Sequence, residues 1–329
     1  MAFNLLADHH TEAHDWYAYE RYVDEGMGVD VSGTVLSVQQ YRLKNEVLVK
    51  VSSRISRQNK SYELIGEAIR ATSTYWFATD ATRLFISSLI HRAQGILDQD
   101  KCLDNFDANN VVVTNKGEAK FRHVKIIEKT YQARRQMYTC IVNVIRGYFD
   151  GYQIPEDMQD LINLMSTQQK DLLYQISPAL LLRHQRSDRY TRLYEYVKYK
   201  VGTFQKELIL EKLLQLPWVL QWKSKVPQNN VLKETFDFIP GSYDLKRPTD
   251  EHNNPTTPWT EREQKLKLVE LLLDFVRNGT AHRSQRKTKV DPDQFETIIM
   301  VFYLMLLPKL QEAVYDVAGK PALVYLGLA

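Results

Sequence analysis

Residues 261–283 read EREQKLKLVELLLDFVRNGTAHR, and this stretch decides the fold of the second half of the chain. Its apolar side chains recur at the i, i+4 and i+7 spacing that makes one wide, buried helix face. These side chains are Leu268, Val269, Leu272, Leu273, Phe275 and Val276. Gly279 suits a helix end because glycine can take the left-handed conformation past the last turn. We therefore predict a leucine-rich helix over 261–278 that Gly279 brings to an end.

Helical spacing extends in both directions from this stretch. Downstream, residues 294–317 form a second apolar segment, and Pro308 predicts a kink or break within it. Upstream, residues 240–258 are rich in Pro, Asp, Asn and Thr and indicate a loop or insertion. Further helix faces are predicted around 161–165, 193–197 and 208–214.

Before about residue 130 the pattern changes to short strand-like runs. The β-rich runs lie at 47–51, 73–77 and 84–86, with a turn expected at Thr79-Asp80-Ala81. Val111–Val113 and Ala119–Phe121 read as a hairpin with a tight turn at Lys116-Gly117. The fold class predicted is mainly α, with a shortened α+β part followed by an all-α part.

Composition limits the classes of protein that this chain can belong to. The 43 basic and 40 acidic side chains give a net charge of only +3, so contact with nucleic acid would need a local basic patch. Two cysteines, Cys102 and Cys140, make neither a disulfide framework nor a four-ligand zinc site, and we expect two buried thiols. His9, His10 and His14 indicate either a metal site or simply a polar N-terminal segment, 1–30.

The chain shows no targeting or spanning segment that we recognise. Its start lacks a basic region followed by a sustained apolar region, so no secretory signal is predicted. The longest apolar run, 298–307, is too short to span a bilayer. We expect a soluble protein of the cytoplasm or nucleus with no membrane partner.

The end of the leucine-rich helix carries side chains suited to RNA cleavage. Arg277 and Asn278 lie at the helix end, and His282 follows one turn of chain later, where we expect it to face solvent. RNA supplies its own nucleophile, the 2′-hydroxyl, so an enzyme needs a proton-transfer group and a cation for the phosphorane charge. Histidine and arginine supply these, and asparagine can hold either in place. The competing interpretation is a helix C-terminus whose Arg and His only complement the helix dipole.

Arg-Asn-x-x-x-His after a leucine-rich helix resembles the signature of the kinase-extension nuclease (KEN/HEPN-type) family, as in RNase L and the ER-stress kinase-endoribonuclease. The similarity extends over about 176–317. Ile176–Leu181 resembles the family's "HP-x-hydrophobic-W" junction, and Val301–Tyr315 resembles its closing "YF-x-x-x-FP-x-L-x-x-x-VY" pattern. The resemblance implies a helical endoribonuclease domain over 176–329 with Arg277, Asn278 and His282 as its catalytic residues.

The family also places a tyrosine about a dozen residues before its arginine. In an alignment without gaps, the tyrosine's position falls near Gln264. Two other residues could take its place: Tyr243, if the loop 244–258 bulges out and lets it return to the site, or Trp259. Basic residues follow the motif, and they either contact RNA phosphates or form a solvated face. These are Arg283, Arg286, Lys287 and Lys289.

Residues 31–175 resemble a shortened, degenerate protein kinase of the same family. Lys50 ends a run similar to the strand that bears the nucleotide lysine, and it is the candidate nucleotide contact. Residues 103–113 align with "HRDLKPNNVLV", with Asn105 in place of the catalytic aspartate. His123 replaces the magnesium-binding aspartate, so we expect no kinase activity. Asn110 either survives as a metal ligand or serves in packing or a turn.

The resemblance therefore implies a metal-independent endoribonuclease on a catalytically dead kinase-like platform. Its partners would be RNA, single-stranded or in a hairpin loop, and a second copy of the chain in a homodimer. No cofactor and no metal are expected. The alternative is a non-catalytic dimerisation partner that regulates a full-length kinase-endoribonuclease through a heterodimer.

Overall fold

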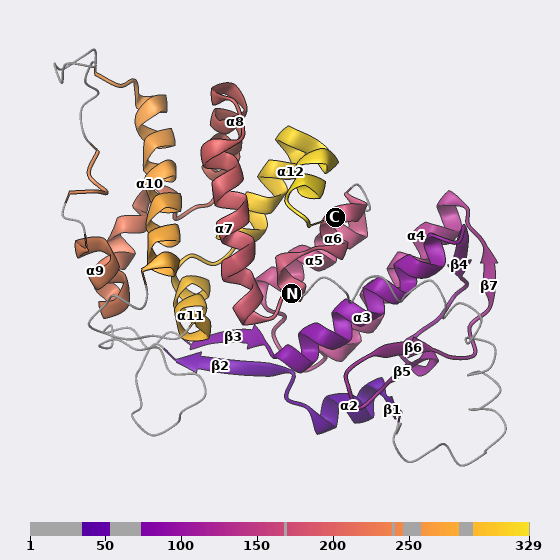
Figure 1. The fold of residues 1–329 in the computed structure, drawn as a ribbon. Helices are drawn as coiled ribbons and strands as arrows, with labels where there is room; N and C mark the ends of the chain where they lie inside the picture. The colour runs from indigo at the N-terminus through magenta and orange to yellow at the C-terminus, as the bar shows by residue number, and fades with distance from the viewer. Residues whose placement is uncertain are drawn as a thin grey trace. The chain divides into compact units, whose positions relative to one another are not determined.

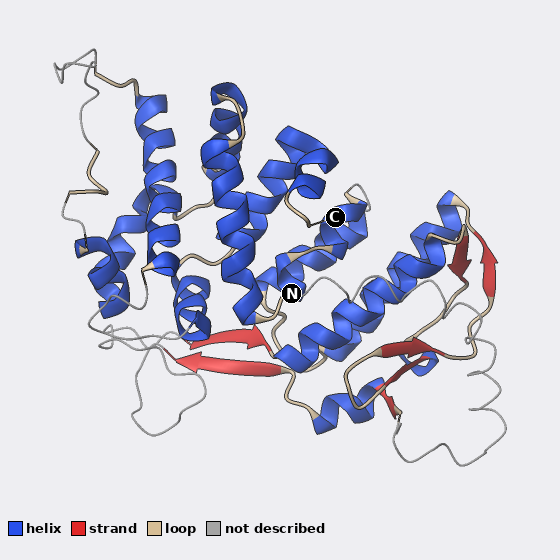
Figure 2. Cartoon of the chain, viewed as in Figure 1, coloured by secondary structure: helices blue, strands red, loops and turns tan. Residues whose placement is uncertain are grey.

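The computed structural model is mainly helical, with a few short strands (Figures 1 and 2). Two compact units divide the chain: a first unit of residues 1–47 with 84–152, and a second unit of residues 48–83 with 153–329. The histidines expected in a polar segment 1–30 lie outside the described residues. The structure describes residues 35–52, 74–167, 170–238, 241–245, 258–282 and 292–328.

Two small antiparallel sheets and their helices form the described part of the first unit. The predicted hairpin is confirmed, because Val113 pairs with Ala119 and Gly117 turns the chain at φ 84°. Both cysteines are buried, as predicted. One sheet has the order β1 (Leu36–Ser37), β5 (Val111–Val113), β6 (Ala119–Phe121), and β4 (Lys101–Leu103) pairs with β7 (Ile126–Glu128). The helices are α2 (Val38–Lys44), α3 (Asp80–Leu97), whose first four residues belong to the second unit, η3 (Ala108–Asn110) and α4 (Tyr131–Tyr148).

The strand predicted at 84–86 is wrong, because these residues lie inside α3. The turn predicted at Thr79-Asp80-Ala81 is the start of the same helix, where the Thr79 hydroxyl accepts the Thr82 N–H at 3.2 Å. The buried side chains reveal the helical period only over a longer window than the three-residue run, at Phe85, Ile86, Leu89, Ile90, Ala93 and Leu97.

The second unit joins a β-hairpin to a bundle of helices. The strands predicted at 47–51 and 73–77 are present as β2 (Leu48–Ser52) and β3 (Thr74–Ala78), which pair antiparallel with Val49 opposite Phe77. The hairpin and residues 153–175 belong to this unit, whereas the sequence pattern predicts both in a first domain, 31–175. The helices are α5 (Glu156–Thr167), α6 (Asp171–Gln175), η4 (Pro178–Leu180), α7 (Arg183–Tyr199), α8 (Thr203–Leu213), η5 (Val219–Gln228), α9 (Asn230–Asp237), α10 (Glu261–Ala281), α11 (Pro292–Phe302) and α12 (Leu306–Tyr325).

Aromatic side chains fill the core of the second unit. Trp222 of η5 is fully buried, lies 5.0 Å from the ring of Phe275, and donates its indole N–H to the carbonyl of Leu268 at 3.1 Å. Val49 and Phe77 of the hairpin join the same core. This core fixes α10 between η5 and the neighbouring helices, and so positions the residues at its C-terminal end.

A buried ionic network lies in the same unit. Asp157 on α5 accepts from Arg83 at 3.2 Å and from Arg186 on α7 at 3.5 Å, and Arg186 also pairs with Glu296 on α11 at 3.1 Å. A backbone carbonyl oxygen is a further acceptor in this network, because Arg83 also donates to the carbonyl of Ala179. Since buried charges are costly unless paired and hydrogen-bonded, this network ties α5, α7, α11 and the first turn of α3 in one arrangement.

The segment predicted as one helix with a break at Pro308 is two helices that meet before that proline. Met305 takes a left-handed φ of 70°, and α11 and α12 differ in direction by 79°. Pro308 lies in the first turn of α12, where a missing N–H costs no helix hydrogen bond. Among the described helices, none alone has the length and apolar character to cross a membrane, and this bent pair meets that test only when taken together.

Candidate active site

The predicted active-site helix is present but ends later than expected. Helix α10 starts with a capping box between Thr260 and Glu263 and continues to Ala281, so the prediction that Gly279 ends it is wrong. Gly279 is buried inside the helix, and a Cβ added there would lie 2.3 Å from Cζ of Phe295 on α11. This glycine therefore permits close helix packing rather than a change of backbone direction.

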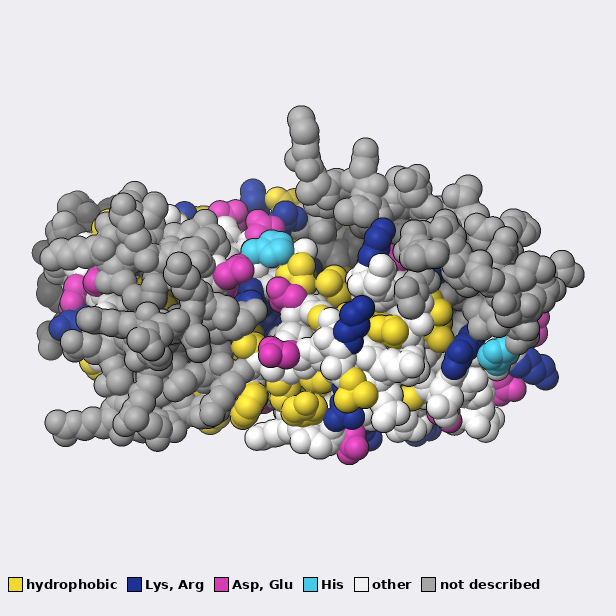
Figure 3. Space-filling model, turned by 90° about the horizontal axis from the view of Figure 1, so that it is seen from below, with side chains coloured by type: hydrophobic (Ala, Val, Ile, Leu, Met, Phe, Trp, Pro, Cys, Tyr) yellow, Lys and Arg dark blue, Asp and Glu magenta, His cyan; other side chains and the backbone are white. Residues whose placement is uncertain are grey.

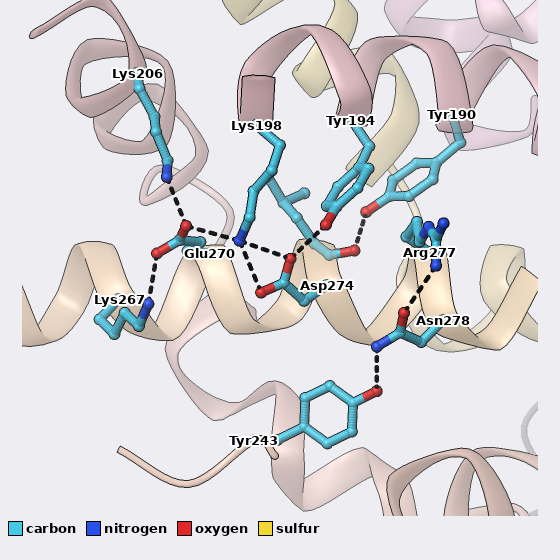
Figure 4. A network of polar contacts seen from close by, with 11 residues as sticks. Tyr190, Tyr194, Lys198, Lys206, Tyr243, Lys267, Glu270, Asp274, Arg277 and Asn278 are labelled. Carbon is cyan, nitrogen blue, oxygen red and sulfur yellow. Dashed lines mark hydrogen bonds and ion pairs between the residues drawn. The ribbon is translucent and has the colours of Figure 1, made fainter. Parts of the chain in front are cut away.

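Three of the predicted site residues are joined by hydrogen bonds. The Arg277 guanidinium donates to Oδ1 of Asn278 at 3.3 Å, and Nδ2 of Asn278 donates to the Tyr243 hydroxyl at 3.1 Å (Figure 4). Tyr243 comes from a turn 35 residues earlier in the chain. The structure thus brings the phenol, the amide and the guanidinium into one chain of contacts.

Tyr243 is held firmly in the core. Its ring is 4% exposed and lies 5.3 Å from both Phe236 and Phe275, and Lys223 donates to its backbone carbonyl. The surrounding aromatic residues leave the hydroxyl directed at Asn278. An asparagine whose amide is held on one side by Tyr243 presents a fixed oxygen to Arg277.

The other candidates for the family tyrosine lie at the opposite end of α10. Gln264 precedes Asn278 by fourteen residues on the same helix, which corresponds to about 21 Å along its axis. The carbonyl of Trp259 accepts from Nε2 of Gln264 at 3.0 Å, so Trp259 lies at that far end too. Of the two residues left open by the sequence, Tyr243 is therefore the one beside Asn278.

His282 caps the C-terminus of α10. Its N–H donates to the carbonyl of Asn278 at 3.0 Å, so it lies one helical turn beyond that residue. The imidazole stacks on the ring of Phe238, with centroids 5.3 Å apart and planes inclined by 22°. The expectation that it faces solvent is corrected, because its side chain is partly buried in this contact. The stack fixes the plane of the imidazole at the same helix end as Arg277.

A carboxylate that the sequence did not single out lies one turn before Arg277. Asp274 accepts the Tyr194 hydroxyl at 2.7 Å and Nζ of Lys198 at 3.1 and 3.2 Å, both from α7 (Figure 4). Burial and this hydrogen bond to Asp274 raise the pKa of Tyr194 above its ordinary range. Tyr194 therefore stays a neutral donor to the Asp274 carboxylate.

Glu270 extends the network along α10. It accepts from Lys198 at 3.0 Å, Lys206 at 2.6 Å and Lys267 at 2.8 Å. Burial raises the pKa of Glu270, but the three ammonium groups oppose this and bring it down to about 2. Burial likewise lowers the pKa of Lys198, yet its bonds to Glu270 and Asp274 more than offset the effect and leave it raised. Lys198 is thus a cation shared by two carboxylates.

Arg277 differs from these charges because it has no ion pair among the described residues. Its one hydrogen bond there goes to the neutral Asn278 amide, and its side chain is partly exposed. Its charge reaches Tyr194, where it acts to lower the pKa of that phenol. The arrangement leaves a cation one turn before the end of α10 that an anion can neutralise.

The predicted RNA contacts Arg283, Arg286, Lys287 and Lys289 lie outside the described residues. On the coloured part of the face in Figure 3, Lys and Arg side chains are dispersed among hydrophobic and acidic ones. On this described part of the face, that distribution agrees with the small net charge of +3.

The nucleotide role expected for Lys50 stays a prediction. Lys50 lies in β2 opposite Trp76 of β3. Its neighbour Val49 lines a cavity of about 10 Å³ together with Thr297 and Met300 of α11. That volume accommodates about one water molecule, so a nucleotide does not fit there.

Asn110 of the first unit takes part in a turn. Asn110 forms a capping box with Asp107, and its Nδ2 donates to the carbonyls of Arg122 at 3.3 Å and His123 at 3.4 Å. These contacts fit the turn duty expected for Asn110. Nowhere in the described ranges do three His, Cys, Asp or Glu side chains group as metal ligands would.

Comparison with known proteins adds no relative. No protein-family model, curated protein or solved structure matches this chain. The chemistry proposed for the site therefore depends on the residues and their geometry alone.

Proposed function

We propose that this chain is a metal-independent endoribonuclease that cleaves single-stranded or hairpin-loop RNA through attack by the RNA's own 2′-hydroxyl. The observation that supports the proposal best is the hydrogen-bonded chain Tyr243–Asn278–Arg277, with His282 one turn further along the same helix. It holds a cation one turn before the end of α10 and an imidazole at the C-cap of the same helix, which is the minimum that in-line cleavage of RNA requires.

Each group has a role in the proposed reaction. The 2′-oxygen attacks phosphorus, the bond from phosphorus to the 5′-oxygen breaks, and the products carry a 2′,3′-cyclic phosphate and a 5′-hydroxyl. His282 transfers a proton at the attacking or leaving oxygen. Arg277 stabilises the charge on the phosphorane oxygens. Asn278, held by Tyr243, orients the guanidinium.

The substrate must present a nucleotide whose backbone can reach the in-line geometry. Unpaired loops and single strands allow this, whereas an A-form duplex holds its backbone in place. The remnant kinase-like residues serve as a platform, and two chains pair to activate the nuclease, as in the family that the sequence resembles. The protein would act in the cytoplasm or nucleus.

Cleavage of a labelled RNA hairpin by the purified full chain, in the presence of EDTA, tests this proposal. His282→Ala should slow cleavage by about 10²–10⁴-fold. Arg277→Ala should slow it by about 10²-fold or more because phosphorane charge is left unstabilised. His184→Ala is the matched control, because His184 is an exposed histidine on α7 of the same unit.

The outcomes separate the enzyme from its rival. Thermal unfolding of each variant shows whether loss of the Phe238–His282 stack has cost the fold. Cleavage by His282→Ala at the parent's rate, or cleavage that requires a divalent ion, would contradict the mechanism. A parent protein that never cleaves RNA, even as a dimer, would favour a non-catalytic partner of a related nuclease.

A further inference from the structure

Arg277 has an opposite charge within reach on its own helix. Asp274 precedes it by three residues on α10, and oppositely charged side chains at this spacing face each other and pair. A guanidinium paired with a carboxylate would lose both its donors and its charge for a phosphate ligand. The structure nevertheless contains no Asp274–Arg277 ion pair among its described contacts.

The reason lies on α7. Both oxygens of Asp274 lie within 3.2 Å of Nζ of Lys198, and one of them also accepts the Tyr194 hydroxyl at 2.7 Å. The Asp274 carboxylate is thereby neutralised by the Lys198 ammonium group and also accepts a hydrogen bond from Tyr194. Arg277 is left with the neutral Asn278 amide.

We propose that Lys198 is a positioning residue that keeps Asp274 away from Arg277 and so preserves Arg277 for a phosphate group. This inference rests on the proposed function only for its catalytic consequence. The competition between Lys198 and Arg277 for one carboxylate exists whether or not RNA is cleaved.

Lys206 supplies a matched comparison. Lys206 lies on α8, and its Nζ is 2.6 Å from Oε1 of Glu270 on α10, but it has no bond to Asp274. Lys198 and Lys206 therefore share a role in holding helices against α10, and of these two lysines Lys198 is the one that bonds to Asp274. A variant pair at these positions separates the two roles.

The test compares Lys198→Met, Lys206→Met and the double variant Lys198→Met/Asp274→Asn in the full chain. Lys198→Met should lower the cleavage rate about tenfold, because the freed carboxylate captures Arg277. The double variant should recover most of that loss, since an amide has no charge to capture the guanidinium. Lys206→Met should cleave at close to the parent's rate. If Lys198 only ties helices together, the double variant will stay as slow as Lys198→Met, and the inference is overturned.

A second measurement does not depend on activity. The Nε–Hε NMR signal of Arg277, identified by its loss in Arg277→Lys, should shift in Lys198→Met and return in the double variant. An unchanged signal in Lys198→Met overturns the inference even if RNA is cleaved. A shifted and restored signal in a protein that cleaves no RNA supports the competition and counts only against the proposed function.

Discussion

Gly279→Ala tests how closely α10 and α11 must approach. In an unstrained helix this change should stabilise by about 1 kcal/mol, because alanine is the better helix former. Here the new Cβ would lie 2.3 Å from Cζ of Phe295 and 3.1 and 3.2 Å from Cε2 and Cε1. The ring would have to retreat by about 1 Å to reach an ordinary carbon contact of about 3.5 Å.

The ring has no room to retreat. Phe295 is 1% exposed, and overpacking a core of this kind costs about 3 kcal/mol at the severe end. Subtracting the gain in helix propensity leaves a net loss of about 2 kcal/mol for Gly279→Ala. In a Phe295→Leu background the far edge of the ring is gone, so the same change should stabilise by about 1 kcal/mol. The predicted coupling energy is thus about 3 kcal/mol.

Urea unfolding of the four proteins in this cycle measures the coupling. Gly95→Ala is the control, because Gly95 is a helical glycine whose added Cβ meets nothing within 4 Å. It should stabilise by about 0.5–1 kcal/mol. If Gly279→Ala stabilises the parent as much as Gly95→Ala does, the contact between Gly279 and Phe295 is absent and the placement of α11 against α10 is refuted.

Three further changes probe the site and its support. Tyr243→Phe removes the hydroxyl that holds Asn278 and should slow RNA cleavage roughly tenfold; a hairpin-cleavage rate equal to the parent's contradicts this. Glu270→Gln tests the pH dependence. The folded pKa of about 2 lies below the ordinary 4.5, so the ionised group stabilises above about pH 4.5 and this is lost as the pH falls through about 2. The pKa difference bounds the stabilisation by ionised Glu270 at about 3 kcal/mol, and partial exposure reduces it to about 1–2 kcal/mol. In urea unfolding, Glu270→Gln should be less stable than the parent at neutral pH, and this difference should shrink in acid. An equal difference at neutral and acid pH counts against the network. Asp157→Ala leaves the buried Arg83 guanidinium unpaired and should cost about 3–5 kcal/mol in the same assay, whereas a loss below about 1 kcal/mol would mean that the ionic network is not buried.

Local periodicity predicted the helices best where an apolar face is long. Helix α10 can be predicted because its buried apolar side chains repeat from Leu266 to Val276, which is about three turns. The strands around Val49 and Phe77 can be predicted because each is a separate run of residues with high β-propensity. The run at 84–86 was misassigned because three residues do not distinguish a strand from a helix segment. The end of α10 was misassigned because Gly279 makes room for the ring of Phe295, a contact sixteen residues away in sequence that the local pattern does not reveal.

The sequence groups the local residues of the candidate site and leaves its long-range contacts open. Arg277, Asn278 and His282 lie within six residues, so a helix end was enough to group them. Tyr243 reaches Asn278 across 35 residues, and nothing in the local pattern chose it over Trp259. The partner of Asp274, Lys198, lies 76 residues away, and its role emerges only when α7 packs on α10.

The chemistry of the RNA ends tests the central claim most directly. We expect the full chain, incubated with a labelled RNA hairpin in EDTA, to leave 2′,3′-cyclic phosphate and 5′-hydroxyl ends by mass spectrometry. A hairpin with a 2′-deoxy nucleotide at the scissile position should stay intact, because the nucleophile is missing. Products with a 5′-phosphate, or cleavage of the 2′-deoxy hairpin at the same bond, would contradict attack by the 2′-hydroxyl and with it the roles given to Arg277 and His282.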